Sequence, residues 1–225
     1  MRESSMRRPP MQGMQIFWSW DIPYFVWEAL LKSTTLPCLI FNYLGPGARL
    51  DDLYLKSIED GLISGAEGWH NDNVGYRLKL FMVFDVEGTP SDTILLPARH
   101  PNPYRFRILS ETIRMLGFIN NKPRPGEVRV GYQAGDCLLF DTNLEHRGDY
   151  TSSSGIRYCL VAEFIDRTKA NSIYRWSPCG PGQGRFPVKV PIEVHELLAS
   201  HPLVDVDLLS EQDGLIYYGY SGTAA

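Results

Sequence analysis

The sequence predicts a mainly β protein, a barrel or jelly roll with a few flanking helices. Beyond Thr35 the chain consists of short runs of β-type residues divided by Gly, Pro, Asn and Asp, which is typical of such folds. Apolar residues recur at helical spacing in only a few places. A chain of 225 residues is long enough for one barrel with its flanking helices, so we expect a single domain.

The N-terminal part, residues 1–35, is expected to form an arm and then a helix that packs on the barrel. Residues 1–13 mix arginines with a Pro pair and favour no fixed structure. Asp21 can cap a helix, and Pro23 suits a first turn. The apolar residues that follow give this helix a broad apolar face that ends near Ser33.

Residues 36–166 are expected to form the barrel itself. Strand character is found in the runs 36–43, 51–58, 66–72, 77–86, 92–97, 127–133, 136–142 and 156–166. The run at 77–86 is apolar on both faces, which indicates a central strand. Apolar residues at helical spacing between the fifth and sixth runs predict one helix, at about 105–118, inserted in a long crossover.

The C-terminal part, residues 167–225, departs from the strand pattern. Residues 167–190 are rich in Gly, Pro and Arg and are expected to form a strap over the barrel. The aromatic and basic side chains of this strap could equally form part of a lid over an anionic substrate. A short helix should begin after Pro191, with a tail behind it.

Composition narrows the class of partner. The formal net charge of −4 gives no basic field, which argues against nucleic acid and anionic membranes and favours a small-molecule substrate. The four cysteines are widely spread and resemble reduced intracellular thiols. No signal peptide or membrane span stands out, so we expect a cytoplasmic protein, and homo-oligomerisation is left open.

The stretch Trp69-His70-Asn71-Asp72 carries the first indication of chemistry. In an extended segment His70 and Asp72 leave the same face, which then presents an imidazole and a carboxylate. With His146 as a third ligand, the set is two histidines and one carboxylate, the facial arrangement of non-haem Fe(II) oxygenases. Short His-x-Asp pairs also occur by chance on surfaces and in cores, so the pair alone does not establish a metal site.

Arg157 adds a second indication. It lies eleven residues after His146 in the apolar run 156–164, where a guanidinium needs an anion. Its planar fork suits the distal carboxylate of 2-oxoglutarate. A salt bridge to a carboxylate of a neighbouring strand is the alternative.

The order His-x-Asp, Gly-Asp with an apolar strand, His-Arg-Gly and then Arg resembles the phytanoyl-CoA dioxygenase-like family of Fe(II)/2-oxoglutarate oxygenases. The matching pieces lie at 44–55, 68–75, 79–81, 135–142 and 146–157. The resemblance implies a double-stranded β-helix of cupin-like jelly-roll type, with His70, Asp72 and His146 as iron ligands. It also implies that Arg157 holds 2-oxoglutarate. Where many members have Pro-Gly-Ser-His, this chain has Pro97-Ala98-Arg99-His100.

Further residues are candidates for roles around this site. Tyr54 lies in a strand that contributes to co-substrate binding in the family that the chain resembles, and its hydroxyl could assist Arg157. Lys79 could approach a carboxylate of 2-oxoglutarate, or instead extend its ammonium outward to solvent. Asp141 is a candidate to orient a ligating imidazole.

These features favour an Fe(II)- and 2-oxoglutarate-dependent dioxygenase that oxidises a small organic substrate, such as an intermediate of secondary metabolism. Hydroxylation is the default outcome, with O2 consumed and succinate and CO2 released. Two alternatives remain. A Zn2+ hydrolase could use the same three ligands, and a non-catalytic barrel could bind a small ligand.

Overall fold

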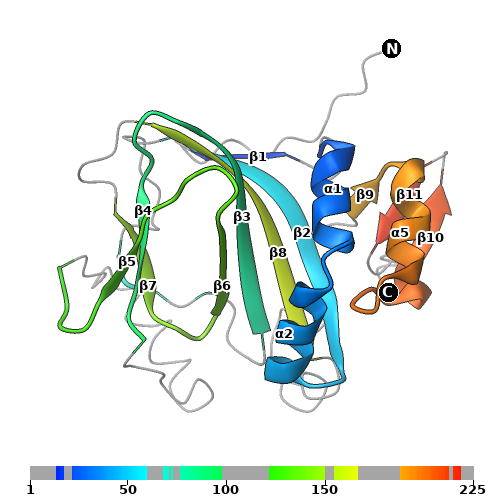
Figure 1. Cartoon of the computed structure of the whole chain (residues 1–225), viewed down its shortest axis with the longest axis horizontal. Helices are drawn as coiled ribbons and strands as arrows, with labels where there is room; N and C mark the ends of the chain where they lie inside the picture. Colours follow the sequence, from blue (N-terminus) through cyan, green and yellow to red (C-terminus); the bar gives the residue numbers. More distant parts are fainter. Residues whose placement is uncertain are drawn as a thin grey trace, which may run out of the picture.

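The computed structural model describes residues 14–17, 22–59, 68–70, 72, 77–97, 122–149, 155–166, 188–212 and 215–218. Within these residues a large and a small antiparallel sheet form the barrel (Figure 1). Helices lie beside the larger sheet. The mainly β class expected from the sequence is confirmed.

The larger sheet has the strand order β1-β2-β8-β3-β6. Its strands are β1 (Met14–Phe17), β2 (Ala48–Glu59), β8 (Ile156–Asp166), β3 (Arg77–Glu87) and β6 (Cys137–Asp141). The smaller sheet, in the order β5-β4-β7, contains β5 (Val128–Val130), β4 (Asp92–Leu95) and β7 (His146–Asp149). Every pairing in both sheets is antiparallel.

The path of the chain gives the winding of a double-stranded β-helix. An isolated bridge to His146 adds His70 to the smaller sheet, next to β7. From β2 the chain visits His70, β3, β4, β5, β6, β7 and β8 in turn. It changes sheet at every step except between β4 and β5. The jelly-roll fold expected for this chain is therefore confirmed.

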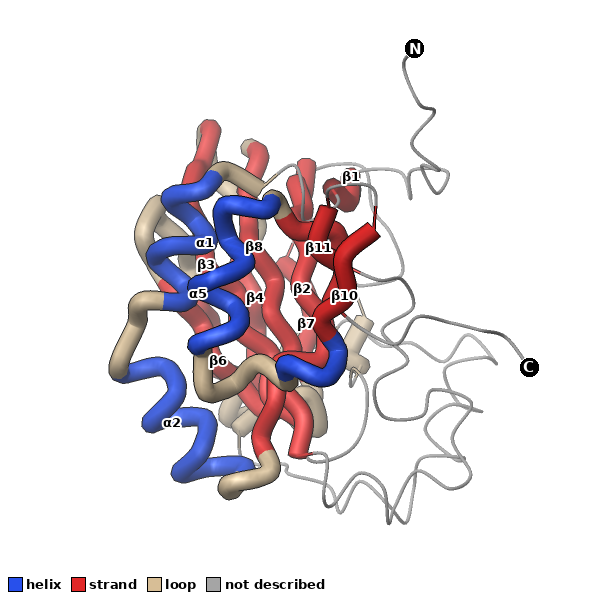
Figure 2. The backbone as a smooth tube through the Cα atoms, turned by 90° about the vertical axis from the view of Figure 1, so that its right-hand side faces the viewer, coloured by secondary structure: helices blue, strands red, loops and turns tan. Residues whose placement is uncertain are grey.

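Helices cover the outer face of the larger sheet (Figure 2). They are α1 (Tyr24–Leu31), α2 (Thr35–Leu44) and α5 (His195–Ser200). The main apolar core lies between these helices and the sheet, and its fully buried members include Trp27, Ile40, Leu53, Leu160 and Phe164. The expected N-terminal helix is confirmed, although Pro23 is its N-cap and Asp21 lies outside the described residues. No described helix is long and apolar enough to cross a membrane.

The strand expected at 36–43 is wrong, because these residues belong to helix α2. The buried apolar side chains recur at every fourth position, as Leu36, Ile40 and Leu44. Pro37 lies in the first turn, where its missing N–H removes no helical hydrogen bond. Gly45 ends the helix at a φ of 105°, a conformation that favours glycine. A short unbroken apolar run does not by itself distinguish a strand from a helix.

Most other expected strands are found with shifted ends. The strands expected at 77–86 and 156–166 are confirmed as β3 and β8. The run at 66–72 contributes only the bridge at His70 among its described residues. Strand β7 was not expected, and it begins at His146 itself.

The C-terminal part contains a third sheet that was not expected from the sequence. It pairs β10 (Leu209–Gln212) with β11 (Leu215–Tyr218) and β11 with β9 (Val188–Val190). The short helix after Pro191 is confirmed, as η3 (Ile192–Val194) leading into α5, and η4 (Val206–Leu208) follows. Several predictions concern segments outside the described residues, namely the arm at 1–13, residues 98–100, the helix at 105–118 and the strap at 167–187.

Strand β3 is buried on both faces, as its sequence predicted. Leu78 and Leu80 belong to the core beneath the helices. Phe81 and Val83 point to the interior of the barrel and pack with Phe140 and other residues of a second apolar cluster. The interior face therefore combines this apolar cluster with the charged groups described next.

Candidate metal centre

His70 and His146 are brought together by the smaller sheet. The His70 N–H donates to the His146 carbonyl at 2.9 Å, and the His146 N–H donates to the His70 carbonyl at 2.8 Å. This reciprocal pair makes the two residues direct neighbours across the ladder. Their ring centroids lie 4.3 Å apart. Backbone pairing therefore fixes the spacing of the two imidazoles.

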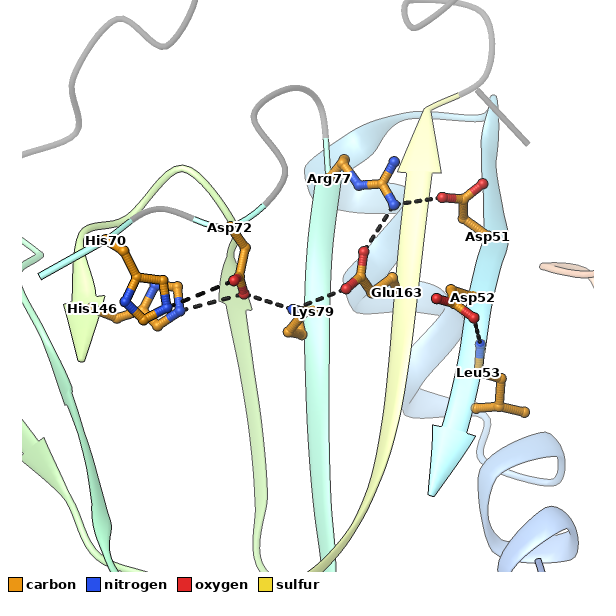
Figure 3. A network of polar contacts seen from close by, with 9 residues as sticks. All are labelled: Asp51, Asp52, Leu53, His70, Asp72, Arg77, Lys79, His146 and Glu163. Carbon is orange, nitrogen blue, oxygen red and sulfur yellow. Dashed lines mark hydrogen bonds and ion pairs between the residues drawn. The ribbon is translucent and has the colours of Figure 1, made fainter. Parts of the chain in front are cut away.

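Asp72 completes the group of three. Its N–H donates to the Thr142 carbonyl at 3.1 Å, which holds the segment after His70 beside the turn that leads into β7. The Asp72 carboxylate lies 3.3 Å from His146 Nε2 and 3.8 Å from His70 Nε2 (Figure 3). One donor atom from each residue lies within 4.8 Å of the others. The structure thus brings together the three residues that the sequence suggested as ligands.

Both imidazoles are oriented by backbone carbonyls. His70 Nδ1 lies 2.8 Å from the Gly68 carbonyl, and His146 Nδ1 lies 2.9 Å from the Leu144 carbonyl. A carbonyl only accepts, so each Nδ1 carries a proton, and in a neutral ring the Nε2 lone pair then faces Asp72. Burial and the neighbouring His146 lower the pKa of His70 to about 4, which keeps this ring neutral. Neutral imidazoles are the form that binds metal.

Asp141 was expected to orient the imidazole of His146, but its carboxylate is hydrogen-bonded to other groups. Its carboxylate accepts from the Tyr43 hydroxyl at 2.5 Å and from the Asn143 N–H at 2.7 Å. These bonds shape the turn between β6 and β7 and attach it to α2. Asp141 therefore supports His146 through the backbone, and the ring itself is oriented by Leu144.

Lys79 is buried beside Asp72, so the expectation of an outward lysine is wrong. Its ammonium donates to Asp72 Oδ2 at 2.6 Å and lies 2.9 Å from Glu163 Oε1. Burial opposes ionisation of Asp72, but the neighbouring Lys79 ammonium outweighs it and holds the pKa of Asp72 well below its usual value. Contact of Lys79 with 2-oxoglutarate stays a prediction.

Arg157 is 3% exposed on the interior face of β8. Within the described residues its Nε and Nη1 have no hydrogen-bond partner, and no carboxylate forms an ion pair with it. Its guanidinium lies 4.2 Å from the ring centroid of Tyr132, whose hydroxyl donates to Thr93 Oγ1 at 2.6 Å. The salt-bridge alternative thus finds no support in the described part of the chain. A buried guanidinium with unused donors is a site for an anion.

Lys56 is an interior cation that was missed at the level of sequence. Its ammonium lies 4.4 Å from the ring centroid of Phe81. Burial lowers its pKa to about 8, and the charges acting on it include Asp72 and Arg157, so it lies within electrostatic reach of both. Tyr54 precedes Lys56 by two residues in β2, so both side chains lie on the same face of the strand. Because Tyr54 was already a candidate, this spacing would have identified Lys56 from the sequence. Burial raises the pKa of Tyr54, which lies among charges that include Lys79.

Trp69 anchors the outer side of the His70 segment. It is 7% exposed, and its indole N–H donates to the Lys122 carbonyl at 2.9 Å. The guanidinium groups of Arg124 and Arg147 lie 4.9 Å and 5.3 Å from its ring centroid. Cation–π contacts of this kind add to the burial of the ring.

We expect Trp69→Ala to lower the free energy of unfolding by about 3–5 kcal/mol, because it removes a buried aromatic ring and leaves a cavity. Urea unfolding followed by circular dichroism measures this change. Val128→Ala removes an exposed apolar side chain and is the control, with an expected effect within about 0.5 kcal/mol. Equal effects of the two substitutions would contradict an anchoring role for Trp69.

Asp52 makes the stability of the fold depend on pH. Burial, followed by the charges of Glu163 and Asp51, raises the pKa of its carboxyl to about 7. The folded protein then binds more protons than the unfolded chain between about pH 4 and pH 7, so stability falls as pH rises through this range. Between about pH 5 and pH 8 the free energy of unfolding of the wild-type protein should fall by an amount on the order of 2 kcal/mol, and we expect Asp52→Asn to abolish this fall. Denaturant unfolding at both pH values tests this, and Asp85→Asn on an exposed aspartate should leave the fall in place.

Comparison with known proteins gives matches among solved structures only. No protein-family model and no curated protein sequence matches this chain. HygX from Streptomyces hygroscopicus, solved with nickel and 2-oxoglutarate bound, is 14% identical at a TM-score of 0.47, over 70% of this chain and 72% of HygX. AviO1 from Streptomyces viridochromogenes Tue57 is 19% identical at a TM-score of 0.41, over 68% of this chain and 62% of AviO1.

A further match is SnoN from nogalamycin biosynthesis, described as a non-heme alpha-ketoglutarate-dependent epimerase. It is 21% identical at a TM-score of 0.43, over 73% of this chain and 68% of SnoN. Similarity of shape at this level does not establish function, which depends on the side chains of the site.

Proposed function

We propose that this protein is an Fe(II)- and 2-oxoglutarate-dependent oxygenase of a small organic substrate. The observation that carries the proposal is the combination of the His70–Asp72–His146 group with Arg157, a buried guanidinium without a described carboxylate partner. The first feature suits a metal ion. The second suits the far carboxylate of a co-substrate that chelates this ion.

The donor set fits ferrous iron. Two neutral imidazole nitrogens and one carboxylate oxygen converge, and they leave several positions on a six-coordinate ion for exogenous ligands. A structural zinc site would instead be closed by four protein ligands. With iron, 2-oxoglutarate and O2 bound, such a centre supplies the oxidising chemistry, in which the co-substrate becomes succinate and CO2.

The interior side chains divide the remaining work. Arg157 binds the distal carboxylate with its Nε and Nη1 donors, and the Tyr132 ring keeps the guanidinium plane in place. Lys56, whose ammonium lies against Phe81 of the same interior cluster, adds a second positive charge. Phe81, Phe140 and Val161 line the interior and exclude water around these groups.

The reaction that we propose is hydroxylation of an unactivated C–H bond, with desaturation, cyclisation or epimerisation as related outcomes. Asp72 bears on this choice, because transfer of a halide would need the carboxylate position vacated. The zinc-hydrolase alternative leaves Arg157 without a role. A purely ligand-binding barrel gives no reason for the two Nε2 atoms and Asp72 to converge.

Decarboxylation of 2-oxoglutarate tests this proposal. The protein is incubated in air with Fe(II) and with 2-oxoglutarate labelled in the carboxylate next to the keto group, and released CO2 is counted. We expect release that exceeds that of His146→Ala and that disappears when Zn2+ replaces iron. No release from protein shown to bind both iron and 2-oxoglutarate would overturn the proposal in favour of a binding role.

Replacement of Lys56 should weaken the binding of 2-oxoglutarate without affecting the binding of iron. We expect Lys56→Met to raise the Kd of 2-oxoglutarate about tenfold, because one charge-assisted contact is lost. Lys56→Arg, which keeps the charge, should retain most of the affinity. Anaerobic calorimetry of the iron-loaded proteins measures both constants. Unchanged affinity in Lys56→Met would assign Lys56 to packing against Phe81 alone.

A further inference from the structure

A chain of alternating charges runs from Asp72 across three neighbouring strands of the larger sheet. Lys79 on β3 contacts Asp72 and also Glu163 on β8. The other oxygen of Glu163 accepts from Arg77 Nη2 at 2.8 Å, and the same nitrogen donates to Asp51 Oδ2 on β2 at 2.5 Å (Figure 3). Asp72 is thus the end of an ordered ionic row.

The row is buried well enough to be rigid. The side chain of Lys79 is 9% exposed, that of Glu163 5% and that of Arg77 7%. A buried charge is tolerated only when it is paired, so each member is held by its neighbours. The Lys79 ammonium is therefore held between the carboxylates of Asp72 and Glu163.

We propose that Lys79 is a positioning residue that engages one oxygen of Asp72 and leaves the other for the metal. A free carboxylate can bind an ion through one oxygen or through both. Lys79 donates to Asp72 Oδ2, which also lies 3.3 Å from His146 Nε2, and Glu163 holds Lys79 from the far side. The oxygen left for the metal is therefore Oδ1, 3.8 Å from His70 Nε2. The inference rests on the proposed function, since one oxygen from Asp72 keeps open the coordination position that a chelating co-substrate and O2 together require.

The charge of Lys79 decides in which direction the metal affinity should change when this residue is replaced, and a purely structural role predicts the opposite direction. An ammonium next to the metal opposes binding of a divalent cation. Its removal should therefore tighten metal binding while it frees the second carboxylate oxygen. If Lys79 only supported the fold, its loss would disorder Asp72 and weaken the binding of the metal ion.

The test uses Mn(II) alone as the probe. Water-proton relaxation counts the exchangeable waters on the bound ion, and titration gives its Kd. For Lys79→Met we expect one fewer bound water than in the wild-type protein and a Kd lower by roughly fivefold to tenfold. Lys79→Arg, which keeps a charged donor for Asp72, should retain the wild-type water count.

Lys79→Met leaves Glu163 with fewer partners, so a second variant removes both charges. Lys79→Met combined with Glu163→Gln keeps the net charge of the site and should also show one fewer water. An unchanged water count in both variants, or weaker Mn(II) binding in both, would overturn the inference while leaving the proposed function in place. If the wild-type protein itself binds no Mn(II), Fe(II) or Co(II), the proposed function fails first.

Discussion

Replacement of His146 by alanine is expected to weaken Fe(II) binding by at least about 100-fold, since the loss of a ligand should exceed the effect of losing a group that merely orients one. The imidazole of His146 is 3.3 Å from Asp72 and is held in its ligating tautomer by Leu144. Its removal leaves one imidazole and one carboxylate, too few donors to hold the ion firmly in water. Competition with a metal-sensitive dye under anaerobic conditions measures the Kd.

The matched control is His195→Ala, a histidine of helix α5 outside the barrel interior. It should leave the Kd for Fe(II) unchanged. The fold should survive in both variants, because the β7 ladder bonds of residue 146 come from its backbone. If His146→Ala and His195→Ala bound iron equally well, the assignment of the metal centre would be wrong.

Replacement of Arg157 by methionine is expected to raise the Kd of 2-oxoglutarate by about 100-fold, with iron binding retained. Two charge-assisted hydrogen bonds in a buried setting contribute about 3 kcal/mol together, and methionine fills much of the same volume. Since Arg157 has no carboxylate partner among the described residues, its loss leaves no described buried anion unpaired. The measurement is anaerobic calorimetry of the iron-loaded protein.

Arg129→Met serves as the comparison for Arg157→Met. Arg129 is half exposed and pairs with Asp92 and Asp149 of the smaller sheet. We expect this variant to bind 2-oxoglutarate like the wild-type protein. A wild-type affinity for 2-oxoglutarate in Arg157→Met would contradict the role of Arg157 in binding the co-substrate. It would also remove the reason to prefer 2-oxoglutarate over other small ligands.

The sequence was informative wherever period and chemistry agreed. The run at 77–86, apolar on both faces, and the apolar run that begins at 156 were both assigned as strands, and they were located to within a residue at each end. His70 and Asp72 were recognised because their spacing places two ligand types on one face. Arg157 was recognised because a guanidinium in an apolar strand requires an anion.

Other features depend on contacts between distant parts of the chain. The run at 36–43 fits a strand by composition, and only its packing on the larger sheet decides for a helix. Lys79 looked like a surface lysine because its partners lie seven residues away at Asp72 and on another strand at Glu163. The pairing of β7 with His70 likewise appears only once the sheet is formed.

The central claim is that one site holds iron and 2-oxoglutarate together. It is tested most directly by anaerobic titration of the apoprotein with Fe(II) and then with 2-oxoglutarate, followed by visible absorption. We expect the weak charge-transfer band of a 2-oxo acid chelated to ferrous iron, absent in His146→Ala and weakened in Arg157→Met at limiting 2-oxoglutarate. No band from wild-type protein that binds both components, or a full band from His146→Ala, would contradict the claim.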